Sequence, residues 1–570
     1  MIRFFQYLPA RNIVCAGLLI SLCLCGCSGN SQPVKTSAPG AAAAEKGAAA
    51  AKTQQKSVTE DLLNSILSML SLESLGFASQ EDEVIGLMNQ WQRFSQGNQV
   101  LEEEVALDEA TLEALRSRLS ERQLKQVRRS TFQRSDIERL RNDLLLNAVT
   151  KHAVGQGKTD LERVANIFTY LVRNTELIAS HPDELPLTSY QSYLLGKNTP
   201  ADRGWLFVEL LRQLKINAVI LSGPMPKDIE EWDPNQPFLV GVLLDKHVYL
   251  FDPRLGLPLT IPGAMGTTPA IATLEQVRSK PEILKQYTVA EDKPYPITAE
   301  LLKTPGVFLV GDTGLWCYRF QRLQKAFTGN RAMVISEPLV DGDGQQGLVT
   351  RVVNWPGQPW SASQIAIWTY PETQLSGQES LSAQHQQTLT RITDGWKMPV
   401  VGEKAKKGDQ IIEIRRPTNK FLFARLDHAQ GKLEDAVKGY THVRLELSVR
   451  PDVKEVTERM VYAYLLAAED SLYWTGVCKL DQGGKVDRRI ATDKLQQYLK
   501  VYPKGRWVDA CHILLAQMAA DAGNPAAAVA ELDKVAADHP QGQGLAFLKQ
   551  RWSQAAPVAE APATPAALAK

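Results

Sequence analysis

The stretch TPADRGWLFVELLRQL, residues 199–214, decides the fold of the central part of the chain. It opens with three residue types typical of a helix start: Thr199 at the N-cap, Pro200 at the first helical position and Asp202 in the first turn. Apolar side chains then recur at helical spacing, at Leu206, Phe207, Leu210, Leu211 and Leu214. The stretch therefore predicts an amphipathic helix that begins at Pro200.

Three strand-like runs follow this helix. They lie at 218–221, 238–244 and 248–251 and are rich in β-branched and other apolar residues. Only Asp245-Lys246-His247 separates the last two runs, which predicts a tight hairpin between them. Asp252-Pro253 ends the third run.

The region in front of the helix has a helical pattern of its own. The segment Ser135–Glu138 has the capping-box sequence ahead of an apolar stripe, and Thr159–Glu162 repeats it ahead of the next helix. No catalytic pattern occurs between residues 58 and 155, and the acidic run at 102–104 predicts a solvated face.

A helix followed by antiparallel strands that end in Asp-Pro resembles the transglutaminase-like domain, a relative of the papain fold. The matching segments are LFVELLR at 206–212, INA at 216–218, LFDP at 250–253, and upstream LERVANI at 161–167 with LVRN at 171–174. The resemblance implies a cysteine thiolate at the helix N-terminus, a histidine base on the next strand and an aspartate that orients the imidazole.

Two of these three positions lack the required chemistry. By the family's spacing the cysteine position falls on Pro200 and the histidine position on Pro237, so that only Asp252 matches. His247 precedes Asp252 by five residues, which places the two on opposite faces of one strand. We therefore expect a catalytically inactive domain in which Asp252 binds backbone N–H groups at the strand end.

An enzymatic alternative stays open. A hydrolase or acyl transferase with a non-standard active site could use the hydroxyl of Thr199 or Ser192 near the helix start, although the sequence supplies no base for either. The segment DPRLGLP at 252–258 also resembles bacterial lipoproteins that join an inactive transglutaminase-like domain to a tail of helical repeats.

The first 26 residues have the features of a targeting segment. Arg3 and Arg11 precede and flank an apolar run at 13–24 that is too short to span a bilayer comfortably. The run ends in Leu24-Cys25-Gly26-Cys27, which resembles the lipobox of bacterial lipoproteins and implies lipidation of Cys27. The alternative is an ordinary secretory signal that is cut nearby.

The residues after Cys27 set the expected location. Ser28 stands where an Asp would resemble the inner-membrane retention signal, so we expect an anchor in the outer membrane that faces the periplasm. Residues 27–57 are mostly Ala, Gly, Ser, Thr, Gln and Lys, too poor in apolar side chains to offset the entropy of ordering, and they predict a disordered tether.

Metal and cofactor chemistry finds little support in the sequence. Beyond the targeting segment only Cys317, Cys478 and Cys511 remain, and they lack the spacing of a zinc site. Cys478 and Cys511 lie in helical patterns, where we expect buried side chains, and a disulfide between them is the alternative. The DGDG run at 341–344 lacks the Gly and Glu of a calcium loop and predicts a turn. We expect no metal and no cofactor.

The segment 263–405 mixes helix and strand signals. Residues 273–287 predict a helix, and 332–336 and 347–353 predict strands. Four tryptophans would suit a glycan-binding platform, but their irregular spacing favours ordinary packing: Trp355, Trp360, Trp368 and Trp396.

Residues 417–552 contain an internal repeat. Ala436, Ala491 and Ala528 each occupy a similar place in a pattern of small and apolar residues, and Pro503 and Pro540 follow the last two by twelve. The intervals resemble tetratricopeptide repeats (TPRs), in which small residues let paired helices approach. The resemblance implies a concave surface for an unidentified protein or peptide.

These observations predict a multidomain α+β protein. We expect a lipoprotein signal peptide at 1–26, a disordered tether at 27–57, a helical region at 58–155, the transglutaminase-like domain at 156–262, a small mixed α/β region at 263–405, TPR-like repeats at 417–552 and a disordered tail at 553–570.

Composition and charge agree with this division. The chain has 570 residues, of which 44% are hydrophobic and 22% charged, as in soluble globular proteins. Its 64 Lys and Arg nearly balance 63 Asp and Glu, which leaves no global basic field for nucleic acid. We expect a lipid-anchored envelope scaffold that binds a protein partner through its repeats.

Overall fold

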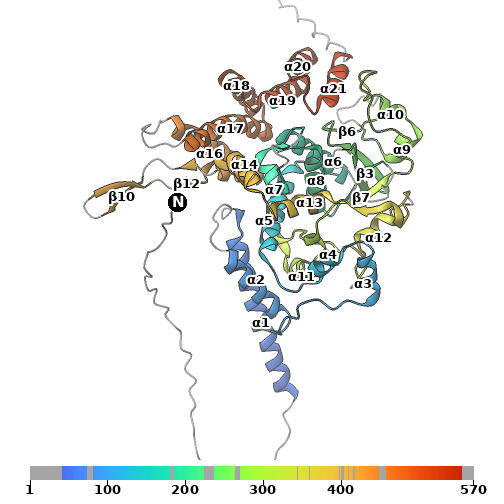
Figure 1. The fold of residues 1–570 in the computed structure, drawn as a ribbon, viewed down its shortest axis with the longest axis vertical. Coiled ribbons are helices and arrows are strands. Elements are labelled where there is room, and N and C mark those ends of the chain that lie inside the picture. The colour runs from blue at the N-terminus through green and yellow to red at the C-terminus, as the bar shows by residue number, and fades with distance from the viewer. Residues whose placement is uncertain are drawn as a thin grey trace, which may run out of the picture. The chain divides into compact units, whose positions relative to one another are not determined.

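The computed structural model describes the chain with gaps. The described residues are 41–72, 81–179, 181, 185–223, 236–262, 270–342, 344–358, 360–396, 398–399, 403–407, 410–414, 417–448 and 458–554. The chain divides into two units, Met1–Gln54 and Gln55–Lys570. Its fold is mixed α+β, 61% helical with one six-stranded sheet, which confirms the predicted class (Figure 1).

The sheet has the order β6-β5-β4-β3-β7-β8. Its strands are β3 (Asn217–Ser222), β4 (Leu239–Leu244), β5 (His247–Asp252), β6 (Leu257–Pro258), β7 (Gly306–Leu309) and β8 (Ile365–Ile367). All neighbours pair antiparallel except β7 and β8, which are parallel. The three predicted strands and the hairpin are confirmed, and Asp245 and Lys246 form its turn with positive φ angles of 49° and 68°.

Both faces of the sheet are buried, which explains why its strands are almost continuously apolar. Ala218 and Ile220 of β3 join a core with the helices α5 (Arg134–Ala153), α6 (Asp160–Asn174) and α8 (Pro200–Gln213). The alternate residues Val219 and Leu221 join a second core that residues 255–302 and 339–365 complete. The predicted helix is therefore packed directly against the sheet.

The sheet extends across the predicted boundary at residue 262. Strands β7 and β8 come from the segment 263–405, yet β7 pairs with β3. Two strand predictions in this segment were wrong. Residues 348–353 form the helix α12 (Leu348–Val353), and 332–336 has no regular structure, because side-chain amides of Gln213 and Gln324 take the backbone N–H groups of 334–336. These N–H groups are therefore not available to pair with a neighbouring strand.

The N-terminal part of the second unit is helical. It contains the second half of α1 (Ala41–Met69), which begins in the first unit, then α2 (Glu81–Ser95), α3 (Glu109–Arg116) and α4 (Glu121–Arg128), followed by α5 and α6. Residues 41–57, expected in the disordered tether, are helical here, as the high helix propensity of Ala favours. Helix α5 begins at Arg134 with Gln133 as its N-cap, so the capping box predicted at Ser135 lies two residues further upstream.

The remaining elements are short except in the C-terminal part. They are β1 (Glu176–Leu177), α7 (Ser189–Leu195), β2 (Lys197–Asn198), α9 (Leu274–Ser279), α10 (Glu282–Lys285), the 3-10 helix η4 (Thr313–Trp316), α11 (Tyr318–Ala326), η5 (Gly329–Arg331), η6 (Ala362–Gln364), α13 (Tyr370–Glu379), α14 (Ala383–Thr393), η7 (Asp394–Trp396), β9 (Met398–Pro399), β10 (Glu403–Lys407), β11 (Gln410–Ile414) and β12 (Pro417–Thr418).

The C-terminal part consists of consecutive helices, as the internal repeat predicts (Figure 1). They are α15 (Lys420–Ala429), α16 (Leu433–Ser448), α17 (Glu458–Gln482), α18 (Lys485–Val501), α19 (Val508–Asp521), α20 (Pro525–Leu532) and α21 (Gly542–Gln554). Ala436, Ala491 and Ala528 lie on α16, α18 and α20, the second helix of each pair, and all three are completely buried. Small side chains are therefore found where the pattern places them.

Buried polar contacts join these helices to the part of the chain before them. Arg425 on α15 donates to the backbone carbonyls of Tyr193 and Leu194 at 3.1 and 3.2 Å, and its guanidinium carbon lies 3.5 Å from the ring centre of Trp474. Asp481 of α17 accepts from Arg173 on α6 at 2.8 Å. These bonds tie α15 and α17 to α6 and α7.

Candidate functional site

The N-terminus of α8 is built as predicted. Thr199 is the N-cap, and its hydroxyl accepts the backbone N–H of Asp202 at 3.2 Å, while the Asp202 carboxylate accepts the backbone N–H of Thr199 at 2.9 Å. Pro200 occupies the first helical position. The place where the resemblance implies a thiolate thus holds a residue that starts the helix and has no nucleophile.

The implied histidine position is filled by apolar packing. Phe238, next to Pro237, begins the approach to β4, and its ring lies so close to α8 that a Cβ on Gly204 would stand 2.9 Å from it. The lack of a side chain at Gly204 is what lets this ring pack on the helix. An apolar ring therefore lies where a base would be needed.

Asp252 has a structural role at the end of β5. Its Oδ1 accepts the backbone N–H groups of Arg254 and Leu255 at 2.7 and 2.9 Å, and its Oδ2 accepts the hydroxyl of Tyr295 at 2.6 Å. Burial raises the pKa of the carboxyl group, which the three donors offset in part. The prediction that Asp252 binds backbone N–H groups at the strand end is confirmed, and Tyr295 is a further partner.

His247 does not contribute to this site. It lies at the exposed start of β5, and its Nδ1 is 3.9 Å from a carboxylate oxygen of Glu275. The prediction that His247 and Asp252 do not pair is confirmed. The other sequence candidate, Ser192, is completely buried in α7 with no hydrogen bond to its hydroxyl among the described residues.

A histidine that the sequence analysis missed lies at the start of α8. His181 Nε2 is 2.5 Å from Asp202 Oδ2, and Asp202 Oδ1 accepts the hydroxyl of Tyr370 at 2.8 Å. The hydroxyl of Thr199 donates to Asp202 rather than to the imidazole. Burial disfavours the charge of the Asp202 carboxylate, but the nearby His181 outweighs this effect, and the pKa of Asp202 is lowered. His181 therefore stabilises the ionised carboxylate and does not activate Thr199. Its isolated place in the sequence gave no signal.

The three cysteines of the folded part are unreactive thiols. Cys317, Cys478 and Cys511 are free and buried, so the disulfide considered between the last two is not formed. Burial raises the pKa of Cys317 to about 12, and its thiol donates to the carbonyl of Thr313 at 3.3 Å. Burial raises the pKa of the other two thiols as well. Thiolate chemistry needs the opposite environment.

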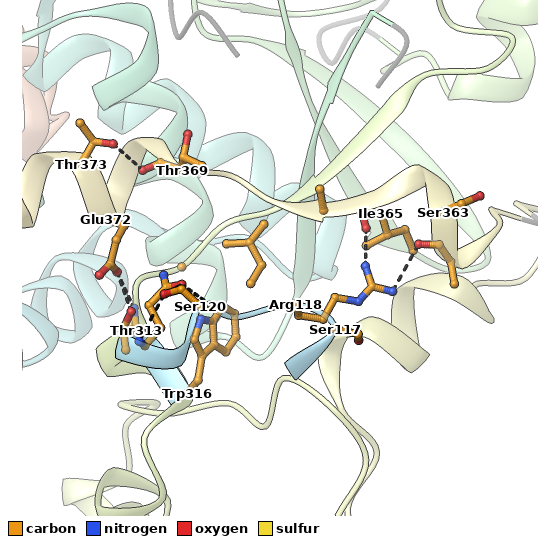
Figure 2. Close-up of a pocket in the computed structure, with 15 residues that line it drawn as sticks. Ser117, Arg118, Ser120, Thr313, Trp316, Ser363, Ile365, Thr369, Glu372 and Thr373 are labelled. Atoms are coloured by element: carbon orange, nitrogen blue, oxygen red, sulfur yellow. Dashed lines mark hydrogen bonds between the residues drawn. The ribbon is translucent and has the colours of Figure 1, made fainter. Parts of the chain in front are cut away.

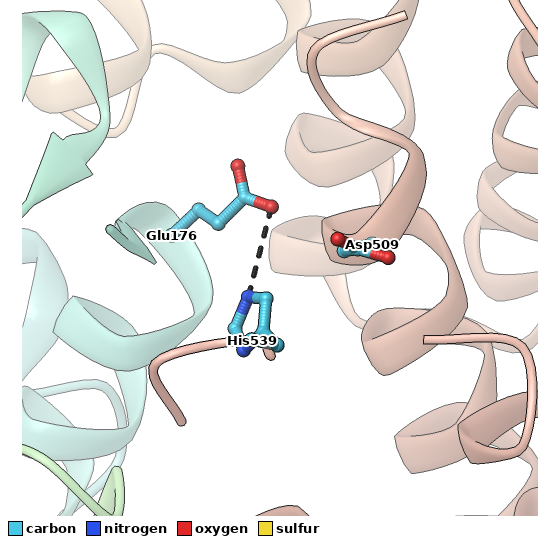
Figure 3. Close-up of side chains that lie close together, drawn as sticks. All are labelled: Glu176, Asp509 and His539. Atoms are coloured by element: carbon cyan, nitrogen blue, oxygen red, sulfur yellow. Dashed lines mark ion pairs between the residues drawn. The ribbon is translucent and has the colours of Figure 1, made fainter. Parts of the chain in front are cut away.

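Glu176, Asp509 and His539 converge from β1, α19 and the segment before α21 (Figure 3). Their ligand-type atoms lie within 4.8 Å of one another, and carboxylates with an imidazole suit several divalent metals. However, His539 Nδ1 accepts the backbone N–H of Gln541 at 3.2 Å, so the neutral ring carries its proton on Nε2, which faces Glu176 at 3.9 Å.

The second oxygen of Glu176 is also occupied, because Lys197 Nζ pairs with it. The nitrogen that would bind a metal is thus protonated, and one of the carboxylates is held by the amino group of Lys197, whose pKa burial lowers to about 7. The arrangement fits a polar contact of β1 and β2 with the C-terminal helices, in which Lys197 also donates to the Arg506 carbonyl at 2.6 Å, better than a metal centre.

A cavity of about 870 Å³ lies beside β8 (Figure 2). Its lining comes from the α3–α4 connection and α4, from η4 and the segment before it, from η6 and β8, and from the start of α13: Ser117, Arg118, Ser120, Gln123, Gly311, Thr313, Trp316, Ala362, Ser363, Ile365, Ala366, Ile367, Thr369, Glu372 and Thr373. Figure 2 shows Arg118 at one end, Glu372 at the other and Trp316 between them. Its size falls within the range of ligand-binding cavities.

The repeats expose an apolar surface. Leu445 on α16 and Val461, Tyr462 and Leu465 on α17 are 45 to 61% exposed, and we refer to these four residues as the repeat patch. Tyr462 also lines a cavity of about 760 Å³ between α14 and α17, beside the ion pair of Arg459 with Asp394. Val461 and Leu465 are four residues apart and therefore share one face of α17, and exposed apolar side chains that share a face are typical of interaction surfaces.

The tryptophans considered as a glycan platform serve packing instead. Trp360 and Trp368 are buried, and Trp355 and Trp396 are partly buried against apolar clusters. The DGDG segment forms a turn at Gly342 and Gln345, as predicted, with Asp343 outside the described residues.

Comparison with known proteins gives no match: no protein-family model, no curated protein and no solved structure matches the chain.

Proposed function

We propose that the protein is a lipid-anchored scaffold of the bacterial cell envelope that holds a partner protein through TPR-like repeats. In this proposal residues 156–262 form a transglutaminase-like domain without its chemistry, and Cys27 carries the lipid. Cys27 lies outside the described residues. Within the described part of the chain, no helix is both long and apolar enough to cross a bilayer.

The repeat patch carries the proposal. The described residues expose eight large apolar side chains, and four of these belong to the repeat patch. The four lie on α16 and α17, two consecutive helices that pack together. Burying such side chains in an interface gains about 25 cal/mol per Å² of apolar area. Helical repeats commonly present this kind of surface to a protein or peptide.

The site at the start of α8 supports the inactive half of the proposal. Proline at 200 and 237 supplies neither a nucleophile nor a base, and the Asp252 carboxylate accepts hydrogen bonds from three structural donors. A triad that lacks its nucleophile keeps little activity. The hydrolase alternative requires a nucleophile that a base can deprotonate. The described cysteines are buried thiols, and the hydroxyl of Thr199 donates to the Asp202 carboxylate, a weak base because its pKa is lowered, while His181 pairs with Asp202 and not with Thr199.

The experiment compares two surface variants of the full chain in envelope membranes. Leu465→Ser removes an apolar contact from the repeat patch, and Val486→Ser makes the same kind of change on α18, where Val486 is exposed to the same 61%. Cross-linked partners are quantified by mass spectrometry. The proposal expects one protein to be recovered with the wild type and with Val486→Ser, and at least about tenfold less with Leu465→Ser.

Equal recovery with both variants would show that the repeat patch does not bind the partner. Recovery that also survives deletion of residues from 421 onward would move partner binding to the part of the chain before the repeats.

A further inference from the structure

Strand β8 has an open edge. It is the last strand of the sheet and pairs on one side only, with β7. Trp368, directly after β8, donates its backbone N–H to the Leu309 carbonyl at 2.8 Å. Backbone groups alternate in direction along a strand, so the N–H and C=O groups of Ile365 and Ile367 point away from β7.

The cavity beside β8 lies along this edge. Ile365, Ala366 and Ile367 form one wall, and the α3–α4 connection forms the facing wall. An open edge that faces a groove is the arrangement in which an extended peptide adds to a sheet. Main-chain hydrogen bonds then supply affinity, and the groove selects alternate side chains.

One side chain already uses the edge in this manner. Arg118 donates through Nη1 to the Ile365 carbonyl and through Nη2 to the Ala362 carbonyl at 3.3 Å. The guanidinium thus provides donors that a neighbouring strand would otherwise provide. It fills only the start of the edge, and the backbone groups of Ile367 lie further along the groove.

The other end of the groove holds the carboxylate of Glu372. Glu372 Oε2 accepts the backbone N–H and the hydroxyl of Thr313 at 2.8 and 2.9 Å, which leaves Oε1 for a ligand. Burial raises the pKa of Glu372, and the nearby Asp312, whose carboxylate pairs with Arg139, raises it further. A cationic side chain placed here would relieve the cost of burying that charge.

We propose that the groove along β8 binds an extended segment of another polypeptide by strand addition, with a Lys or Arg side chain of that segment at Glu372. The site is separate from the repeat patch and goes beyond the scaffold function proposed for the repeats. Its essential main-chain group is the N–H of Ile367, and its essential side chain is Glu372.

The main-chain step can be tested by removing one N–H. Ile367→Pro deletes the outward N–H but no bond to β7, and proline is tolerated on edge strands when its nitrogen faces outward. Ile367→Ala shortens the side chain in the same place and keeps the N–H. A phage-displayed library of random heptapeptides is selected against the full chain in detergent, and a selected peptide is synthesised for measurement of Kd by fluorescence anisotropy.

We expect selected peptides to be rich in Lys or Arg and to bind Ile367→Pro about tenfold more weakly than Ile367→Ala, the effect of one hydrogen bond of about 1.4 kcal/mol. Glu372→Gln, which leaves the strand untouched, should remove the preference for a basic residue. Leu465→Ser should bind the peptide as the wild type does, which separates this site from the repeats.

Three results would overturn the proposal. They are failure to enrich any peptide, equal affinity of Ile367→Pro and Ile367→Ala with both variants folded by near-ultraviolet circular dichroism, and a basic preference that persists in Glu372→Gln.

Discussion

Replacing Asp252 separates its structural role from a catalytic one. Asp252→Ala would leave three donors without an acceptor: the N–H groups of Arg254 and Leu255 and the hydroxyl of Tyr295. Each buried donor left unpaired costs about 1–3 kcal/mol. Since the Arg254 N–H is only partly buried and can reach water, we expect a local cost of about 3–5 kcal/mol.

Asp252→Asn is the matched control. Its amide oxygen can still accept both backbone N–H groups, and its NH₂ group can donate to the Tyr295 oxygen. Asp252→Asn also removes the charge of a buried carboxyl group whose pKa is raised by burial. We therefore expect a cost of about 1 kcal/mol for this variant.

Amide hydrogen exchange at Leu255 measures the effect locally. At 1.36 kcal/mol per factor of ten, a cost of 3 kcal/mol accelerates exchange by roughly 150-fold and 1 kcal/mol by roughly fivefold. Changes under about threefold in both variants would refute the structural role of Asp252. An Asp252→Asn protein that exchanges normally but loses a hydrolytic activity would instead favour the enzymatic alternative.

Three further changes test other parts of the chain. Ala528→Leu should overpack the buried contact of α20 at a cost of about 1–3 kcal/mol, seen as faster amide exchange in α19–α21 and unchanged exchange in β3–β5. Burial lowers the pKa of His428, so the imidazole stays neutral in the folded state, whereas in the unfolded chain it takes up a proton near pH 6.5. The free energy of unfolding should therefore fall as the pH drops below that value. Melting curves at pH 7.5 and 5.5 should show a smaller drop for His428→Gln than for the wild type. Cys27→Ser should move the protein from the membrane fraction to the soluble fraction on centrifugation, and retention on the membrane would contradict the lipid anchor.

Local signals in the sequence predicted the central elements well. The cap at Thr199, the proline at the first helical position and the hairpin turn at Asp245 and Lys246 depend on backbone geometry within a few residues, so residue type alone indicates them. The role of Asp252 also followed from its neighbours in the chain, because it binds N–H groups two and three residues away.

Predictions failed where distant groups decide the backbone. Residues 332–336 have the composition of a strand, yet side-chain amides of Gln213 and Gln324 take their N–H groups. Residues 347–353 are rich in valine, but packing makes them the helix α12. Nothing near either segment in the sequence gives a sign of these partners.

The sequence by itself determined which chemistry is missing at the implied catalytic positions, because proline at 200 and 237 excludes a nucleophile and a base whatever the fold. It also indicated the consecutive helices of the C-terminal part, since the recurring pattern of small and apolar residues lies within the chain. Only the tertiary structure decided which surfaces are open. The edge of β8, the groove between Arg118 and Glu372 and the repeat patch depend on segments far apart in the sequence, and exposure is a property of how those segments pack.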